Sequence, residues 1–312
     1  MACAIAVLVA LAGAAVRVLP WLLEPAVSAK VALPFVRSLA ALAVEAAIFV
    51  GWPVGWALAA AGFVERGEHK VLQTLGERPG RTVARLLPQG AVFAAALAAV
   101  SFWGGRDAGE PGRVVSELLA EGRAACSSSI EPRAYVIPFA GAAWLCAPGA
   151  PPHIAGRGPG ALGRLAFSAA DAEVAGDLRR IELEDARIVF AKADVHVGRA
   201  TLKGLTPWAH ASNLPPTARA LLLAVCAAAA AASSVYAALR RWIRRRFGAI
   251  AVGASGPLAA LGLLRMLERT DVRPGWAVLA LPVALGASLG CAWLLVMVRR
   301  ARLPRSAAAA ST

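Results

Sequence analysis

The chain has 312 residues, of which 58% are hydrophobic and only 17% are charged. A typical soluble domain is about 25% charged, so this composition excludes an ordinary pair of soluble domains. The net charge of +14 does not indicate a nucleic-acid-binding domain, because the excess basic residues lie at the ends of long apolar segments. Several segments have the roughly 20 apolar residues needed to cross a membrane. The sequence therefore predicts a protein that crosses a membrane several times.

Six membrane spans are expected, near residues 2–23, 33–63, 86–104, 217–239, 248–268 and 275–298. Three of them precede a long polar stretch and three follow it, which divides the chain into 1–104, 105–215 and 216–312. We interpret the first segment as a span rather than a cleaved signal peptide, because no basic residue precedes its apolar run.

The basic residues are distributed unevenly between the two sides of this arrangement. Fourteen arginines and lysines lie on one side, in the segments 64–85, 240–247 and the tail after residue 298, and three lie in the loops of the other side. Loops rich in arginine and lysine stay in the cytoplasm. The pattern predicts that both termini are cytoplasmic and that residues 105–215 are exported.

The polar stretch 105–215 holds 12 basic and 12 acidic residues and is long enough for a small folded domain. Helical spacing over 111–124 is followed by segments in which apolar and polar residues alternate, as in half-buried strands. Strands are expected at 135–139, 162–167, 180–184, 186–190 and 195–202, and loop at 146–160. The predicted fold class is a membrane protein with six transmembrane α-helices and a β-rich domain inserted between the third and the fourth.

Cys126 and Cys146 both lie in the predicted exported domain. An exported compartment permits disulfides. The spacing of the two cysteines does not decide whether they are bonded, because a disulfide requires a specific geometry.

No catalytic or metal-binding pattern is found in the sequence. The four histidines are scattered, and the matches to G-x-G-x-x-G at 158–163 and G-x-S-x-G at 286–290 lack the strand and helix that such motifs require. The chain has no Walker A sequence, so ATP hydrolysis would need a separate protein. We expect no catalytic residue, no metal and no cofactor.

Charged residues within the predicted spans are costly, at about 2.5–3.5 kcal/mol each at a helix centre. Glu45 is therefore expected in a buried ion pair or beside a water-filled cavity. Arg219, near the start of a span, is interpreted as extending its side chain to the membrane interface. Arg17, Lys30 and Arg37 share one outer level, where they fit either a lipid phosphate or ordinary headgroup anchoring.

Gly253, Gly256 and Pro257 lie in the fifth predicted span. Proline removes a backbone hydrogen bond, and glycine loosens helix packing. We expect a bend or a moving element at this position.

The loop at 64–85 contains a short apolar stripe of Val71, Leu72 and Leu75, and Gly76 is expected to end the helix that carries it. An amphipathic helix between two spans is a docking element for a cytoplasmic partner. The alternative is a solvated connector.

A resemblance to a known family rests on this loop. Arg66, Glu68, Leu72, Leu75 and Gly76, followed by an apolar span, resemble the coupling helix of the lipopolysaccharide-export permeases of the LptF/LptG (YjgP/YjgQ) type. The order of three spans, one exported β-rich domain and three spans is similar to that family, and 165–190 resembles the start of its jellyroll-like domain. The exported domain here is shorter than the family's, and the chain begins almost directly in its first span.

The resemblance implies a permease subunit that forms a heterodimer with a paralogous subunit in the bacterial inner membrane. Its coupling helix would bind a cytoplasmic ABC ATPase dimer, and a single-span bridging protein of the LptC type would associate with the complex. The implied cargo is lipopolysaccharide, with Arg17, Lys30 and Arg37 in the region that meets lipid A phosphates and the fifth span at a lateral gate. The alternatives are another ABC-type membrane subunit and a membrane-anchored envelope scaffold or sensor.

Overall fold

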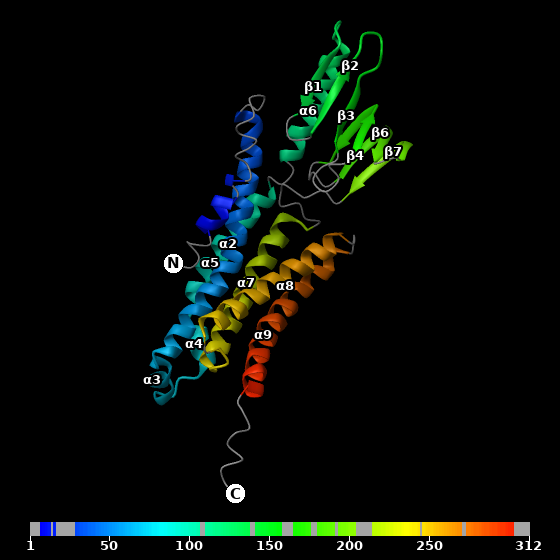
Figure 1. Ribbon diagram of the computed structural model, residues 1–312. Helices are drawn as coiled ribbons and strands as arrows, with labels where there is room; N and C mark the ends of the chain where they lie inside the picture. The colour runs from blue at the N-terminus through cyan, green and yellow to red at the C-terminus, as the bar shows by residue number, and fades with distance from the viewer. Residues whose placement is uncertain are drawn as a thin grey trace. The chain divides into compact units, whose positions relative to one another are not determined.

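The computed structural model describes residues 7–13, 15–16, 29–106, 110–137, 141–157, 165–175, 180–190, 193–203, 214–243, 245–269 and 273–302. The chain divides into two compact units. The helical unit comprises Met1–Ala12, Ala43–Trp103 and Ser212–Thr312, and the sheet unit comprises Gly13–Leu42 and Gly104–Ala211 (Figure 1).

Five segments of the described residues are long and apolar enough to cross a membrane. They contain the helices α2 (Ala29–Glu65), α5 (Leu87–Arg106), α7 (Pro216–Leu239), α8 (Arg246–Arg269) and α9 (Ala280–Arg302), the last preceded by the 3-10 turn η2 (Pro274–Leu279). These helices match the second to sixth predicted spans and indicate a multi-pass membrane protein. Most of the first predicted span, near 2–23, lies outside the described residues.

The helices of the helical unit alternate in direction (Figure 1). The connection between α2 and α5 contains two short helices, α3 (Glu68–Thr74) and α4 (Pro79–Arg85). Val83 and Leu86 of this connection pack into one buried cluster with Ile243 of the turn between α7 and α8. The two arginine-rich loops that were predicted to share one side therefore lie at one end of the helical unit.

Small side chains fill the contacts between these helices. Ala227, Ala230 and Ala231 of α7 are fully buried, and such residues allow helix backbones to approach closely. Larger side chains fill the space between α2 and α5, where Trp52 stacks on Phe93 with ring centroids 5.6 Å apart. The core of the helical unit is thus close-packed mainly by alanine, with a few aromatic rings.

The sheet unit contains a curled antiparallel half-barrel of strands (Figure 1). The described strands are β1 (Arg133–Ile137), β2 (Ala142–Cys146), β3 (His153–Arg157), β4 (Leu165–Ala169), β5 (Asp171–Val174), β6 (Arg180–Phe190) and β7 (Ala193–Lys203). Their order in the sheet is β1-β2-β3-β4-β6-β5, and β7 also pairs with β6. All of these pairs are antiparallel.

Helix α6 (Glu110–Ser127) contributes one side of the core of the sheet unit. The helix predicted over 111–124 is confirmed, with Val115 and Leu119 buried against the strands. At Gly122 a Cβ atom would lie 2.8 Å from the Trp144 indole. The absence of a side chain at Gly122 therefore allows the fully buried indole to lie directly against the helix.

Strand β6 is one strand with a kink rather than the two strands predicted at 180–184 and 186–190. Asp185 adopts a left-handed conformation with φ of 51°, and the paired positions pass from Glu184 directly to Ala186. The kink shifts the alternation of side chains, so that Leu183 and Ala186 are both buried. The same edge of β6 pairs with β5 before the kink and with β4 after it.

The prediction that 146–160 is loop was wrong, because His153–Arg157 forms β3. This strand pairs with β2 on one side and β4 on the other, and its Ile154 is buried. Pairing on both sides outweighs the weak strand propensity of the surrounding glycines and prolines. Strands β2 and β5 were not predicted either.

Candidate functional site

A carboxylate and a guanidinium meet inside the helical unit. Arg219, in the first turn of α7, donates from Nη2 to Oε1 of Glu45 at 2.6 Å and from Nη1 to Oε2 at 3.2 Å. Only 12% of the Arg219 side chain and 4% of the Glu45 side chain are exposed. A two-pronged pair of this kind fixes the relative position of the two groups as well as neutralising them.

This ion pair shows that the prediction for Arg219 was wrong, and it decides between the two environments predicted for Glu45. Arg219 was expected to extend to the membrane interface, but its guanidinium turns inward to the carboxylate. Of the two environments considered for Glu45, the structure shows the ion pair. In a low-dielectric interior a nearby opposite charge is strongly favourable for an arginine. The contact joins α2 and α7 across 174 residues of sequence, so periodicity within either helix could not reveal it.

Helix α8 crosses its neighbours closely at two glycines. A Cβ atom at Gly253 would lie 2.7 Å from the Cα of Val54 in α2, and one at Gly256 would lie 2.4 Å from the Ser288 Oγ in α9. Pro257 lies inside α8, which continues through it as one helix. The structure therefore gives the two glycines a packing function, and the flexibility expected at this position stays a prediction.

Three basic residues were predicted to meet a lipid phosphate. Arg17 lies outside the described residues. Lys30 was placed in a loop, but α2 begins at Ala29, so its backbone belongs to the first turn of that helix. Arg37 follows seven residues later in the same helix and is exposed. The helix starts earlier than the hydropathy pattern suggested because its first turn can form outside the apolar segment.

The short helix predicted in the 64–85 loop is present as α3 and is bounded by two glycines. Gly67 and Gly76 have φ of 80° and 78°, a conformation that only glycine adopts without strain. The N–H groups of Gly76 and Glu77 close the end of the helix by donating to the carbonyls of Gln73 and Leu72, at 3.0 and 2.9 Å. The prediction that the helix ends at Gly76 is confirmed, and its cause is this left-handed cap.

Polar and apolar side chains of α3 lie partly exposed. Nε of Arg66 donates to Oε1 of Glu68 at 2.5 Å, and this hydrogen bond raises the pKa of the guanidinium above its ordinary value. Val71 and Leu75 are 60% and 73% exposed, whereas Leu72, expected in the same stripe, is half-buried. The apolar surface that α3 offers to a partner is therefore formed mainly by Val71 and Leu75.

His69 of α3 was missed by the sequence reasoning. Its side chain is only 3% exposed, and both ring nitrogens lack a hydrogen-bond partner among the described residues. It is the one buried residue of this short helix. A histidine flanked by Glu68 and Lys70 reads as solvated, so no local pattern could have identified this burial.

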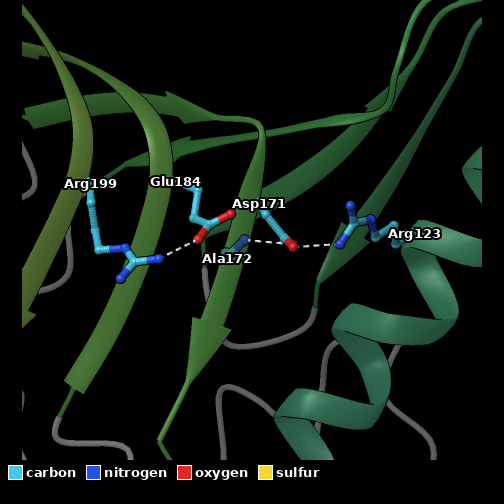
Figure 2. Close-up of polar contacts among 5 residues, drawn as sticks. All are labelled: Arg123, Asp171, Ala172, Glu184 and Arg199. Atoms are coloured by element: carbon cyan, nitrogen blue, oxygen red, sulfur yellow. Dashed lines mark hydrogen bonds and ion pairs between the residues drawn. The ribbon is translucent and has the colours of Figure 1, made fainter.

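The sheet unit is held together by a disulfide and by ion pairs on its surface. Cys126 at the end of α6 is joined to Cys146 of β2 by a disulfide, with the two Cα atoms 5.0 Å apart. Figure 2 shows Arg123 of α6 donating to Asp171 of β5, and Nη2 of Arg199 in β7 donating to Glu184 of β6 at 2.8 Å. The disulfide and the first ion pair thus join α6 to β2 and β5, and the second ion pair joins β6 to β7.

These arrangements hold helices in register and leave one apolar surface exposed. The ion pair and the glycine crossings connect α2, α7, α8 and α9, and α3 presents an apolar surface at one end of the helical unit. Within the part of the chain that the structure describes, no group of three or more histidine, cysteine, aspartate or glutamate side chains is placed to hold a metal. No family model and no curated protein matches the chain.

Proposed function

We propose that this protein is a non-catalytic permease subunit of an ATP-driven lipopolysaccharide exporter. The observation that carries the proposal is the exposed apolar surface of Val71 and Leu75 on a short helix between two spans. Exposed apolar side chains at i and i+4 on a helix fit a groove in a partner protein. The partner proposed here is a cytoplasmic ABC ATPase dimer.

The proposed topology places both termini in the cytoplasm and residues 105–215 in the periplasm of a bacterial inner-membrane protein. Loops 64–85 and 240–247 supply the arginines at one end of the helical unit, and arginine-rich loops remain cytoplasmic. The disulfide between Cys126 and Cys146 suits an oxidising compartment such as the periplasm. Both observations support the same orientation.

In the proposed mechanism, closure of the ATPase dimer on ATP moves α3. Helix α3 follows α2 after a turn at Gly67, and α4 packs against α7 through Val83 and Leu86. A displacement of this connection thus acts on α2 and α7, which the Glu45–Arg219 pair joins near its other end. Moving these helices together would reshape a cavity between this subunit and a paralogous partner.

The choice of lipopolysaccharide as cargo rests on the resemblance to the LptF/LptG permeases. In this proposal Arg17, Lys30 and Arg37 meet the lipid A phosphates, and α8, with Gly253, Gly256 and Pro257, borders a lateral gate. A single-span LptC-type protein then receives the lipid from the complex. Guanidinium groups suit phosphate because they offer several donors in one plane.

The docking claim is tested by adding a charge to the exposed surface of α3. In Val71→Asp/Leu75→Asp, two desolvated carboxylates would oppose an apolar groove, so we expect co-purification of the ATPase to fall at least about tenfold. Gln73→Asp is the matched control, because it adds a charge to another face of the same exposed helix and should retain the ATPase. Equal retention by both variants would overturn the docking claim.

The same purification distinguishes the alternatives. Mass spectrometry of the bound components should find the ATPase, a second permease chain and lipopolysaccharide. Finding an ATPase with lipoprotein as cargo would favour another ABC-type subunit. Finding an envelope protein without an ATPase would favour a scaffold or sensor, and either result would overturn the proposal.

A further inference from the structure

A strongly basic surface lies at one end of the helical unit, in the turn between α7 and α8. Arg240, Arg241, Arg245 and Arg246 are all exposed, and we call residues 240–246 the arginine turn. Figure 1 shows this turn close to α4, whose Val83 packs with Ile243 of the turn. Helix α4 adds a further exposed arginine, Arg81, to the same end.

If α7 spans a membrane, its length places the arginine turn at the depth of lipid headgroups. Helix α7 has 24 residues, which span about 36 Å at roughly 1.5 Å per residue, against a hydrocarbon core of about 30 Å. Arg240 follows the last residue of α7 directly, and Arg246 is the first residue of α8. Phe247 is 80% exposed beside them and Trp242 is half-buried, as expected of aromatic residues at the membrane interface.

Among the residues that the structure describes, few groups neutralise this positive charge. Arg246 lies 3.9 Å from Glu65, and Arg240 donates to the hydroxyl of Tyr236 at 3.0 Å while its guanidinium lies over the same ring. The guanidinium groups of Arg241 and Arg245 have no partner among the described residues. In the described part of the chain, the turn therefore presents several guanidinium groups to its surroundings and forms one ion pair, with Glu65.

Arg241 occupies a backbone position that favours glycine. Its φ is 61°, and its N–H and that of Trp242 donate to the carbonyls of Ala238 and Ala237 at 2.8 and 3.0 Å. This left-handed cap is most often made by glycine, because a side chain is strained there. Arg241 therefore holds a charged side chain at a position where glycine would carry less strain.

We propose that the arginine turn binds the phosphate groups of anionic phospholipids in the leaflet at this end of the helical unit. Guanidinium groups recognise phosphate with several hydrogen bonds, and clusters of basic residues beside a span attract anionic lipid. The depth of the turn and its neighbouring aromatic side chains favour a lipid over a soluble partner. The inference requires only that α7 and α8 span a membrane, and it does not depend on the proposed cargo or ATPase.

The test measures lipid selectivity of the full chain in vesicles that contain phosphatidylcholine and phosphatidylglycerol. Electron spin resonance of spin-labelled lipids gives the relative association of the two headgroups with the protein. We expect the wild type to prefer phosphatidylglycerol, and each arginine removed from the turn to lower that preference about fivefold. The variants are Arg245→Gln and Arg241→Gly, and the second removes the charge and the backbone strain together, so it should fold at least as well as the wild type.

The matched control is Arg265→Gln/Arg273→Gln, which removes two exposed arginines near the other end of α8. This control should retain the preference for phosphatidylglycerol that the turn variants lose. An unchanged preference in Arg241→Gly and Arg245→Gln would overturn the proposal. Loss of the preference when inorganic phosphate replaces chloride at constant ionic strength would also overturn it, since the turn would then bind soluble anions. The same holds if the turn variants change only the binding of a protein partner.

Discussion

The helical unit and the sheet unit use charged residues in opposite ways. In the helical unit the Glu45–Arg219 pair is almost completely buried, while the exposed arginines of the arginine turn gather at one end. In the sheet unit the ion pairs Arg123–Asp171, Arg187–Asp194 and Arg199–Glu184 join neighbouring elements at the surface. The first arrangement suits a hydrocarbon solvent and the second suits water.

Packing differs between the two units as well. Alanine and glycine bring helices close together in the helical unit, where association in lipid relies on packing and polar contacts. The sheet unit buries larger side chains such as Trp144 and Leu183 and adds a disulfide. A small domain in water gains stability by burying apolar side chains and by a disulfide that restricts its unfolded chain. The comparison predicts which substitutions will be costly in each unit.

The largest effect is expected from removing one member of the buried ion pair. Glu45→Leu leaves the guanidinium of Arg219 buried without its main partner, so we expect a loss of about 3–5 kcal/mol in the free energy of unfolding. Thermal unfolding of the full chain in detergent measures it. The double variant Glu45→Leu/Arg219→Leu should recover most of the stability, and a double variant as unstable as the single one would contradict the account of this pair.

The next largest effect is expected from the disulfide of the sheet unit. Cys126→Ser/Cys146→Ser opens a loop whose ends are 20 residues apart in sequence, and a loop of this size corresponds to about 3 kcal/mol through the entropy of the unfolded chain. Chemical unfolding of the sheet unit within the full chain, with and without reductant, measures it. Cys291→Ser is the control, because Cys291 is a free cysteine of α9. Reductant should destabilise this control and leave the double variant unchanged.

A third prediction compares two glycines of the same helix. A Cβ atom at Gly253 would meet the backbone of α2, whereas one at Gly262 meets nothing within 4 Å. Gly253→Ala should therefore cost about 1–3 kcal/mol through overpacking, and Gly262→Ala should gain about 0.5–1 kcal/mol because alanine favours a helix. Thermal unfolding of both variants measures the difference. If both substitutions raised the stability, or both lowered it, the result would contradict the close crossing of α2 and α8.

The smallest effect is expected at the surface of the sheet unit. Hydrogen bonds from Arg187 lower the pKa of the Asp194 carboxyl below its ordinary value of 3.8, so the folded state favours the charged form. The stabilisation is present above pH 3.8 and is lost as the pH falls through the lowered pKa. Asp194→Asn should slightly lower stability at neutral pH, and the difference from the wild type should disappear in acid. If the difference in stability between Asp194→Asn and the wild type grew in acid, the pKa of Asp194 could not be lowered in the folded state.

Sequence patterns were sufficient for features that depend on neighbouring residues. Long apolar runs located α2, α5, α7, α8 and α9, and alternation located most of β1, β4, β6 and β7. The cap at Gly76 was predicted because a left-handed helix end favours glycine. These features are local, so the order of residues along the chain determines them.

Features that depend on contacts between distant segments were missed or only partly predicted. Arg219 was interpreted without its carboxylate partner, because the register of α7 against α2 is not encoded within either helix. β3 forms because strands on both sides pair with it, which its glycine-containing sequence does not indicate. Gly253 and Gly256 indicated flexibility by composition, whereas their surroundings show close packing.

The central claim is that this chain is driven by a separate ATPase through α3. Its most direct test is purification of the tagged full chain from native membranes in mild detergent, followed by mass spectrometry of the bound proteins. The account predicts an ABC ATPase in the complex, present with the wild type and the Gln73→Asp control and lost with Val71→Asp/Leu75→Asp. A stable complex that contains no ATPase would contradict it.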